Sequence, residues 1–579
     1  MQALLAQGYE GKINLIYIDP PFDSKADYSH RMTIEGNEFT KEPSVIERLA
    51  YKDTWAGGTD SYLDMLYPRL QLMNRLLAED GTLYLHCDWR VVHYLKVILD
   101  EIFGPSGPER EGAGFKSEII WFHQVIGMPR TNPFYFPKSH ETIISYSKSE
   151  KVKTKFNSDS RAVRKPFSDS VLKSMKTDEN GNSYYSRGRT GTVNPWAYDP
   201  KYLKTKIDPD KGVLVSDVWD DWRSYQPAGN EKTNFATQKP EFLLNRIIEA
   251  SSGEGDIVAD FFAGSGTTGA VAERLGRRWI MCELGKVGVQ VTRARFVEMG
   301  AKPFLIENIG NYQREMIYLT GGRIWEMQQL VLKLYGATPR DKTSGLGVKK
   351  AADGIDELVY VGYPDRPVTA KKAEELALQA EKLDGTGYKR LVILGWDYEY
   401  NYHQALEARL KGQKERLKVA IQSRDIPPDI YDYLKKAKTE EDIEPLAEKV
   451  HFYERPYLKL SEPETKDEGG GKTRIKIGIK RYVLMDIPVS QTSEQGTKDY
   501  EALMRLAKDN FAVLIDYWAI DWEYDGCTFK SQWQAFRGNG KKAKTVPIIA
   551  TETLEKKKRV IAVRVVDIFG NDAGATVEI

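Results

Sequence analysis

The chain of 579 residues has little cysteine: only Cys87, Cys282 and Cys527, which lie far apart and form no Cys-x-x-Cys pair. This spacing argues against a disulfide framework or a zinc site and is typical of a reducing cytoplasm. No apolar run approaches the roughly 18 residues of a membrane span, and the first residues show no signal-peptide pattern. We therefore expect a soluble, cytoplasmic protein.

The chain also lacks an excess of charge of one sign, because its 84 basic and 83 acidic side chains nearly cancel. A surface for nucleic acid must then be local rather than spread over the whole protein. The chain is too long for a single hydrophobic core, so we expect two to four domains.

The most informative stretch is residues 13–22, Ile-Asn-Leu-Ile-Tyr-Ile-Asp-Pro-Pro-Phe. The β-branched apolar run predicts a buried strand, and prolines cannot continue it, so Asp19 marks its carboxyl end. In an α/β sheet that edge binds ligands. A carboxylate, carbonyls held by Pro20 and Pro21, and the ring of Phe22 would fit a planar base with an exocyclic amine, extruded from the duplex. Asp-Pro at a strand end is also ordinary turn chemistry, so this stretch alone decides nothing.

A second block combines a predicted strand, 256–260, with a glycine turn, Gly264-Ser-Gly-Thr-Thr-Gly269, and a helix. Glycines let the backbone approach a ligand closely. The next strand, 278–283, ends in Glu283, an acid suited to two ribose hydroxyls. The turn also matches the dinucleotide fingerprint G-x-G-x-x-G, which makes a nicotinamide or flavin enzyme the rival from another class.

Together the two blocks resemble amino-group DNA methyltransferases of the permuted β class. The catalytic motif comes first, Asp-Pro-Pro-Phe at 19–22, and the cofactor motif, Asp260-Phe-Phe-Ala-Gly264, follows some 240 residues later, after Thr237-Gln-Lys-Pro240. The resemblance covers about residues 1–310 and implies S-adenosyl-L-methionine as cofactor, with no metal required. It disfavours the dinucleotide enzyme, because Asp-Pro-Pro-Phe has no role in hydride transfer.

The resemblance implies a role for each motif residue. Asp19 and the Pro20 carbonyl would accept hydrogen bonds from an adenine N6 amine, and Phe22 would stack on the flipped base, with Pro21 in the same motif. The residues implied to bind the cofactor are Asp260 (methionine amino group), Phe261, Phe262, Gly264, Gly266, Glu283 (ribose) and Lys239 (methionine end).

The first motif residue favours adenine, because N4-cytosine enzymes of this group more often begin with Ser. An N4-cytosine enzyme stays an alternative, as does a catalytically weak DNA-binding relative. In the family a strand segment ending in an acid precedes the first helix, and here that segment is missing. We expect either a truncated start or weaker cofactor binding.

A basic region separates the two blocks. Residues 151–190 hold ten basic against four acidic side chains, and aromatic residues are interleaved with or follow them. Local positive charge serves phosphate contacts, and aromatics can touch bases, so we predict a target-recognition insert. A solvated basic loop is the alternative. The predicted DNA-binding residues are Arg161, Arg164, Lys165, Arg187 and Arg189.

Around the motifs we predict a mobile loop over 23–60, helices over 61–77 and 91–103, and a strand over 81–88. Two further strands, 117–122 and 142–146, would close the sheet. His86 and Cys87 end the strand at 81–88. Without a third ligand at suitable spacing, they are better explained as a core pair than as metal ligands.

The C-terminal half is less informative. Helices over 370–383 and 403–422 around a strand at 390–396 predict a small α/β unit, and strands are predicted over 473–486, 511–524 and 559–566. Residues 462–472 form a charged linker or hairpin tip. The sequence Gly469-Gly-Gly-Lys-Thr473 at its end resembles half of a phosphate-binding loop. A strand follows it where that loop needs a helix, so we reject ATP binding. Five polar residues could suggest a nuclease metal site: Asp516, Asp521, Glu523, Asp525 and Lys530. Alternating polar positions on an exposed strand pair explain them too, and the nuclease is the weaker alternative.

The predicted fold class is α/β: a circularly permuted, Rossmann-like S-adenosylmethionine-dependent methyltransferase with a target-recognition insert and an α+β C-terminal extension. The predicted parts are a catalytic half at 1–122, closing strands and the insert at 123–236, a cofactor-binding half at 237–310, an α/β unit at 311–430 and a strand-rich domain at 431–579. Similarity to type III modification subunits implies double-stranded DNA, a second copy of the chain and a helicase/nuclease restriction subunit as partners.

Overall fold

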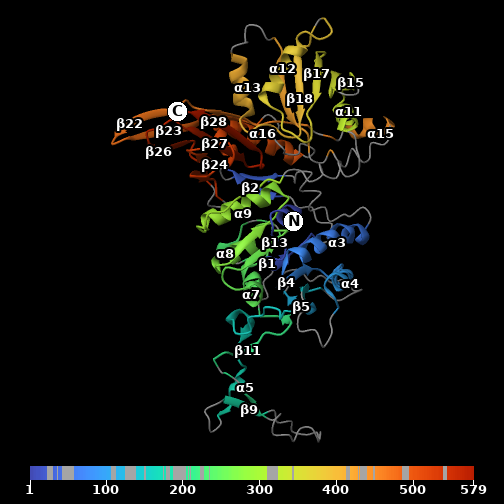
Figure 1. The fold of residues 1–579 in the computed structure, drawn as a ribbon, viewed down its shortest axis with the longest axis vertical. Helices are drawn as coiled ribbons and strands as arrows, with labels where there is room; N and C mark the ends of the chain where they lie inside the picture. The colour runs from blue at the N-terminus through green and yellow to red at the C-terminus, as the bar shows by residue number, and fades with distance from the viewer. Residues whose placement is uncertain are drawn as a thin grey trace. The chain divides into compact units, whose positions relative to one another are not determined.

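The computed structural model (Figure 1) divides the chain into two compact units. The catalytic unit comprises residues 1–27 and 50–304, and the C-terminal unit comprises residues 28–49 and 305–579. The structure describes residues 1–21, 30–34, 37–41, 58–105, 113–123, 138–148, 152–173, 175–177, 183–186, 204–206, 208, 210–221, 227, 229–233, 235, 237–309, 324–341, 344–351, 353–385, 387–411, 418–427, 430, 440–447, 450, 452–484, 494–538 and 544–579.

Seven of the described strands form a mixed sheet in the catalytic unit, in the order β12-β5-β6-β4-β1-β13-β14. Neighbouring strands are parallel except at β6, which runs antiparallel to both β4 and β5. The predicted closing strands are thus present. The strand bounds are β1 Ile13–Ile18, β4 Leu77–Cys87, β5 Gly114–Phe122, β6 His140–Ser147, β12 Val218–Trp219, β13 Ile257–Asp260 and β14 Arg278–Met281.

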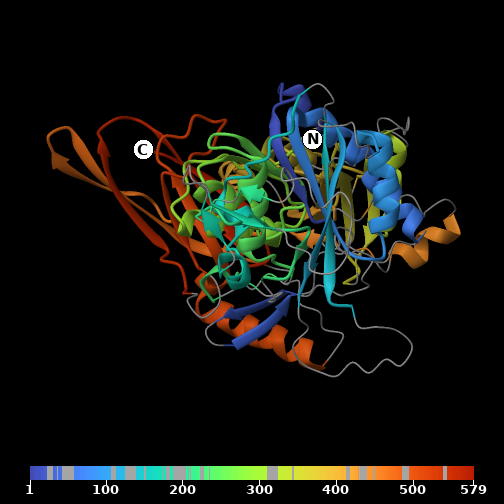
Figure 2. The same cartoon turned by 90° about the horizontal axis from the view of Figure 1, so that it is seen from below.

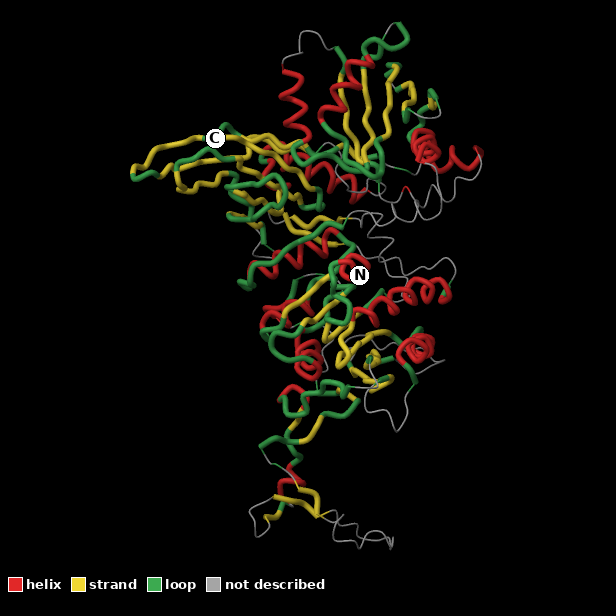
Figure 3. The backbone as a smooth tube through the Cα atoms, viewed as in Figure 1, coloured by secondary structure: helices red, strands yellow, loops and turns green. Residues whose placement is uncertain are grey.

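Helices cover both faces of this sheet, as the ribbon and the tube show (Figures 1 and 3). Because side chains alternate along a strand, Ile16 and Ile18 of β1 share a core with α3 and α4, whereas Leu15 and Tyr17 share one with α7 and α8. Burial on both faces explains why β1 reads as an uninterrupted apolar run. The helix bounds are α1 Gln2–Ala6, α3 Thr59–Leu76, α4 Val92–Phe103, α7 Glu241–Ser251, α8 Thr267–Arg274 and α9 Lys286–Glu298.

The basic region forms small antiparallel pairings within the catalytic unit. One sheet joins β7 to β11, and another has the order β10-β9-β8. The bounds are η1 Arg161–Val163, β7 Arg164–Lys165, α5 Asp169–Lys173, β8 Lys176–Thr177, β9 Ser183–Ser186, β10 Lys204–Lys206, β11 Val213–Leu214 and η3 Gly229–Glu231.

In the C-terminal unit, six described strands form a sheet in the order β15-β16-β17-β18-β19-β20, with β17, β18 and β19 parallel. Helices α11 and α15 share a core with one face, and α12 and α13 with the other. The bounds are α11 Ile324–Leu334, β15 Thr338–Pro339, β16 Leu346–Lys350, β17 Asp356–Val361, α12 Ala370–Ala380, β18 Arg390–Gly395, α13 Tyr402–Lys411, β19 Ala420–Asp425, α15 Glu440–Ala447 and β20 Tyr453–Glu454.

The helix predicted over 403–422 is wrong in its second half. The helix α13 ends at Lys411, and Ala420 already begins β19, whose residues pair in parallel register with β18. Residues 412–417 lie outside the described part of the chain. The apolar residues of this short charged segment have a helical spacing by chance. Pairing of Ala420–Asp425 with the buried strand β18 decides its structure instead.

Eight further described strands form two four-stranded sheets that share one core, including Ile477, Trp518 and Val563. Of the predicted strands, the one over 511–524 begins instead with a short 3-10 helix. The bounds are β21 Tyr457–Leu460, β22 Glu464–Gly469, β23 Lys472–Val483, α16 Glu494–Asp509, η4 Phe511–Leu514, β24 Ile515–Asp521, β25 Trp533–Phe536, β26 Ile549–Glu555, β27 Val560–Asp567 and β28 Asp572–Glu578.

The loop predicted over 23–60 contains regular structure. Strands β2 (His30–Ile34) and β3 (Asn37–Lys41) form an antiparallel hairpin. This hairpin belongs to the C-terminal unit, where it lies beside α16 (Figure 2). An isolated two-stranded hairpin is marginally stable, so packing against a helix explains why this polar segment is ordered.

The two alternative motifs of the C-terminal half have structural explanations. Gly469 ends β22 and Lys472 begins β23, so the glycines form a hairpin turn. Asp521 is fully buried, and its carboxylate accepts hydrogen bonds from the backbone of Glu523 (2.9 Å) and Lys530 (2.7 Å), so the strand is not exposed as predicted. Among the described residues no three His, Cys, Asp or Glu side chains are grouped to hold a metal. Within the same described residues, no helix has the length and apolar character to cross a membrane.

Candidate active site

Four acids follow parallel strands at the same edge of the catalytic sheet. Asp19 follows β1, Asp88 follows β4, Asp260 is the last residue of β13, and Glu283 lies two residues beyond β14. Strand pairing fixes this arrangement, because Ile16 is in register with Ala259, and Asp260 with Met281. The two distant sequence blocks therefore meet at the carboxyl edge, where α/β sheets bind ligands.

Asp19 is held by a lysine from the second block. Its carboxylate Oδ2 lies 2.6 Å from Nζ of Lys239, and both side chains are largely buried, at 16% and 7% exposure. Pro20 is buried and Pro21 is half-buried. Phe22 lies outside the described residues. Lys239, which we expected at the methionine end of the cofactor, thus contacts the predicted catalytic acid.

A second carboxylate approaches the same lysine. Glu141 Oε2 lies 3.8 Å from Lys239 Nζ and 2.8 Å from Nε2 of His86. On the other side of the imidazole, Nδ1 is hydrogen-bonded to the hydroxyl of Tyr17 at 2.8 Å. The chain of contacts therefore runs from Asp19 through Lys239, Glu141 and His86 to Tyr17.

Burial and charge set the protonation of this network. Burial favours the neutral form of Glu141, but Lys239 and His86 outweigh it and lower the pKa of Glu141 to about 2. Burial raises the pKa of Tyr17 well above its usual value, so its hydroxyl stays protonated. Glu141 is therefore an anion at any physiological pH.

Asp260 is buried at the end of β13. Its Oδ2 accepts a hydrogen bond from Thr268 Oγ1 (2.6 Å), and its Oδ1 accepts one from the backbone of Phe262 (2.9 Å). Burial raises the pKa of Asp260 to about 7, which the two hydrogen bonds oppose and the charges of Asp19 and Glu283 reinforce. These three acids thus share one electrostatic environment, and a cation bound beside Asp260 would stabilise its ionised form.

The glycine turn is fixed by Glu283 and by helix α9. Glu283 Oε2 accepts a hydrogen bond from the backbone of Gly264, and Oε1 accepts one from Gly285, both at 2.7 Å. Gly266 has φ = 71°, and a Cβ there would lie 2.6 Å from Cγ2 of Thr292, so only glycine fits. Gly264 has φ = 51°, which also favours glycine.

The two phenylalanines of the cofactor motif differ in burial. Phe261 belongs to the core beside α3 and α4, and Phe262 packs against that core while half-buried. A methyl donor that carries both an ammonium and a ribose fits the acids at this edge. Asp260 is a buried carboxylate that a cation would stabilise, and Glu283 lies next along the sheet.

The predicted DNA-binding residues are not equivalent. Arg164 is used within its own loop, because its guanidinium donates to the backbone carbonyls of Ser158 and Gly212. Arg161 and Lys165 are exposed. Arg187 and Arg189 lie outside the described residues. Trp219, one of the aromatics near this region, is buried in the sheet under Arg246 rather than available to a base.

Sequence reasoning missed Glu141 and the contacts of His86. The interpretation of His86 as a core residue is correct in its burial but omitted its two polar partners. Glu141 lies at the amino end of β6, and because β6 is antiparallel, that end meets the carboxyl ends of β4 and β5. The signal was a charged residue directly before an apolar strand, which identifies no site unless the strand direction is known.

The sheet, the acid before two prolines and the pair of acids at the glycine turn are the arrangement that the resemblance to amino-group DNA methyltransferases implies. The profile of the DNA methylase family matches residues 13–293. The chain is 32% identical over 288 residues to the type II methyltransferase M2.LlaDCHI of Lactococcus lactis subsp. cremoris, covering 49% of this chain and 81% of that relative. The chain belongs to the DNA methylase family and uses S-adenosyl-L-methionine, and its fold is that of an S-adenosylmethionine-dependent methyltransferase.

The names of two other relatives give a target base or a type of restriction system. The DNA adenine methyltransferase YhdJ of Escherichia coli K12 is 26% identical over 291 residues, which cover 50% of this chain and 75% of YhdJ. The StyLTI Mod subunit of a type III restriction-modification enzyme from Salmonella typhimurium is 27% identical over 339 residues. That match covers 48% of this chain and 50% of the subunit. The predicted circular permutation and five-part division stay predictions.

Proposed function

We propose that this chain methylates N6 of an adenine flipped out of double-stranded DNA. The observation that carries the proposal is the placement of Asp19 at the sheet edge, in the same electrostatic environment as Asp260 and Glu283. The adenine relative supports the choice of base. N4-cytosine is the alternative that a base-specific assay excludes.

Each residue at the carboxyl edge of the sheet has its own proposed role. Asp19 Oδ1 has no hydrogen bond to another described residue, and together with the Pro20 carbonyl it would accept the two hydrogens of the amine. Phe22 would stack on the base. Asp260 would pair with the amino group of the methyl donor, and Glu283, beside Gly264 and Gly266, would bind the ribose.

S-adenosylmethionine, held by Asp260 and Glu283, would supply an activated methyl group to the amine nitrogen, and the electrons of the carbon–sulfur bond would stay with sulfur. The nitrogen then releases one proton, which Asp19 accepts. Positioning contributes most of the rate, because the methyl group is already activated.

We infer a restriction-modification context from the relatives, with duplex DNA as substrate. Of the predicted DNA-binding residues, Arg161 and Lys165 are exposed, and we propose that they contact phosphates. A second copy of the chain and a helicase/nuclease restriction subunit are the proposed protein partners, as in a type III system. Residues 305–579 of the C-terminal unit, which lie beyond the matched family region, are the proposed contact surface for them.

The test is transfer of tritium from labelled cofactor to duplex DNA, followed by digestion to nucleosides and identification of the labelled base. Asp19→Ala should abolish transfer, by at least about a thousandfold, while the dissociation constant of the cofactor stays within about threefold. Lys165→Ala should instead weaken DNA binding with a smaller salt dependence. Label on cytosine would overturn the choice of base, and full activity of Asp19→Ala would remove Asp19 from the mechanism.

A further inference from the structure

The contacts beyond Asp19 form a buried polar chain that the motifs alone do not explain. Lys239 comes from the segment before α7, Glu141 from β6, His86 from β4 and Tyr17 from β1. His86 is completely buried, and Glu141 and Lys239 are nearly so. Three strands and a loop thus contribute to one chain of contacts, which ends at the Lys239 ammonium 2.6 Å from Asp19.

A lysine in this place needs an anchor. Its side chain has four rotatable bonds, and fixing it costs rotamer entropy. Asp19 alone would hold the ammonium by one contact, on a segment that also receives the base. Glu141 provides a second carboxylate, whose Oε2 lies 3.8 Å from the ammonium, and Nε2 of His86 contacts the same oxygen at 2.8 Å. Tyr17 in turn orients the imidazole.

We propose that Glu141 and His86 are positioning residues for methyl transfer: they hold the Lys239 ammonium on Asp19 Oδ2, so that Oδ1 stays directed at the amine of the base. This inference rests on the proposed catalytic role of Asp19. Neither residue touches the base or the methyl donor, and both act only through Lys239.

The arrangement also suits the charge that develops in the reaction. The amine nitrogen becomes positive when it gains the methyl group and stays so until it releases its proton. Asp19 and Glu141 place two carboxylates around one ammonium, and the proposal puts Asp19 beside that nitrogen. Fixed charges in a buried site act most strongly on the charge that forms in the transition state.

The experiment is a double-mutant cycle on the full-length chain with duplex DNA and labelled cofactor. Glu141→Gln keeps the shape of the side chain and removes its charge, and Lys239→Met removes the ammonium. We expect Glu141→Gln to lower kcat about 10- to 100-fold, with KM for the cofactor within about twofold, and Lys239→Met to lower kcat further. The double variant should be no slower than Lys239→Met alone, because Glu141 acts through Lys239.

Glu118→Gln is the matched control, because Glu118 is an exposed acid on the neighbouring strand β5, and it should retain wild-type kcat. Glu141→Asp keeps the charge and should recover part of the activity; it replaces Glu141→Gln in the cycle if the latter does not fold. Factors that multiply in the double variant, or a Glu141→Gln variant with wild-type kcat, would overturn the inference. An inactive wild-type chain would instead overturn the proposed function.

Discussion

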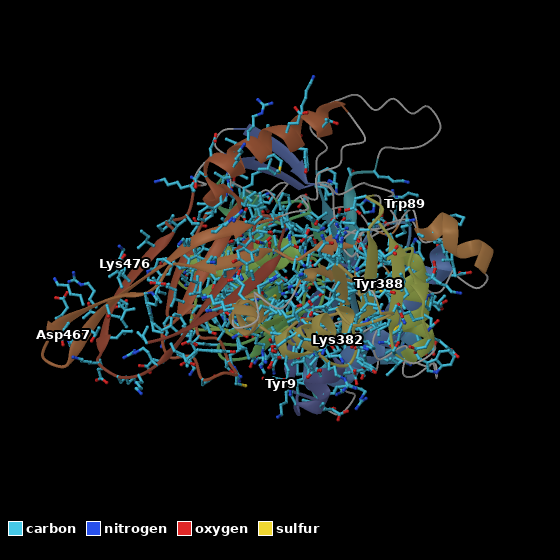
Figure 4. The ribbon with its side chains drawn as sticks, turned by 90° about the horizontal axis from the view of Figure 1, so that it is seen from above. Tyr9, Trp89, Lys382, Tyr388, Asp467 and Lys476 are labelled. Carbon is cyan, nitrogen blue, oxygen red and sulfur yellow. The ribbon has the colours of Figure 1, made fainter. Side chains whose placement is uncertain are left out.

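Ion pairs occur in two contrasting settings in this protein. Around Asp19 they are buried, and the side chains of Asp19, Glu141 and Lys239 are at most 16% exposed. On the ribbon formed by β22, β23 and β26 they face solvent. Asp467 and Lys476 lie on this ribbon (Figure 4), and Lys476 pairs with Glu464 at 41% and 71% exposure.

The difference shows what a charged contact contributes in each place. Exposed pairs are screened by water and salt and typically add less than about 1 kcal/mol. Buried pairs contribute little net stability, but removing one partner leaves an uncompensated charge, which costs about 3–5 kcal/mol. We infer that the buried set is kept for the geometry it imposes, and the exposed set for the solubility of a charged ribbon.

The largest effect is expected at Lys239. Lys239→Met leaves Asp19 and Glu141 without the ammonium between them, so the thermal unfolding midpoint should fall by on the order of 10 °C, measured by calorimetry. Lys165→Met, which removes an exposed lysine, should leave the midpoint unchanged. Equal midpoints for the two variants would remove the energetic distinction between the buried and the exposed pairs.

The next largest effect is expected at a buried acid that has no part in the proposed reaction, so it should change stability without changing kcat. Asp567, in the C-terminal unit, is buried and accepts hydrogen bonds from the Tyr482 hydroxyl (3.0 Å) and the backbone of Asn571 (2.8 Å) and Phe569 (2.9 Å). Asp567→Asn would turn an amide NH2 toward one of these donors. We expect the unfolding midpoint to fall by on the order of 5 °C with kcat unchanged. A loss of kcat at the temperature where the variant is folded would contradict this view.

A third effect concerns pH. Because burial raises the pKa of Asp260 to about 7, the carboxyl is largely protonated below pH 7 and ionised above it. An ammonium binds the ionised form, so cofactor affinity should fall on the order of tenfold from pH 7.5 to pH 6, measured by calorimetric titration. Asp260→Asn should bind weakly at both pH values. A pH-independent affinity in the wild-type chain would place the ammonium elsewhere.

The smallest effect is expected on the ribbon. Lys476→Met removes the partner of Glu464 but leaves that carboxylate in water. The unfolding midpoint should shift by less than about 1 °C, in either direction. A larger loss would mean that the ribbon pairs couple into a network, which 0.5 M salt should then weaken as well.

Much of the fold was predictable where the sequence has a long hydrophobic pattern. The strand before Asp19, the helices α3 and α4 and the strand before the glycine turn follow from apolar runs and prolines. The meeting of Asp19 with Asp260 and Glu283 followed from parallel strands. The position of Glu141 could not be predicted, because it depends on the direction of β6. How two strands pair cannot be read from the sequence of either strand alone.

The contact of Lys239 with Asp19 escaped prediction for a similar reason. A lysine reaches several ångströms from its backbone, so its sequence motif fixes where it starts and not which acid it meets. The hairpin of β2 and β3 was missed because its strands are short and polar and depend on a helix more than 450 residues later in the chain.

That hairpin has a consequence for synthesis of the protein. It leaves the ribosome early, whereas its partner α16 is made only near the end of translation. At roughly 5–20 residues per second, the hairpin waits from about twenty seconds to a minute and a half with its strand edges unprotected. The catalytic unit meanwhile has its full sequence, so we expect it to fold first, with the early hairpin joining the other unit last.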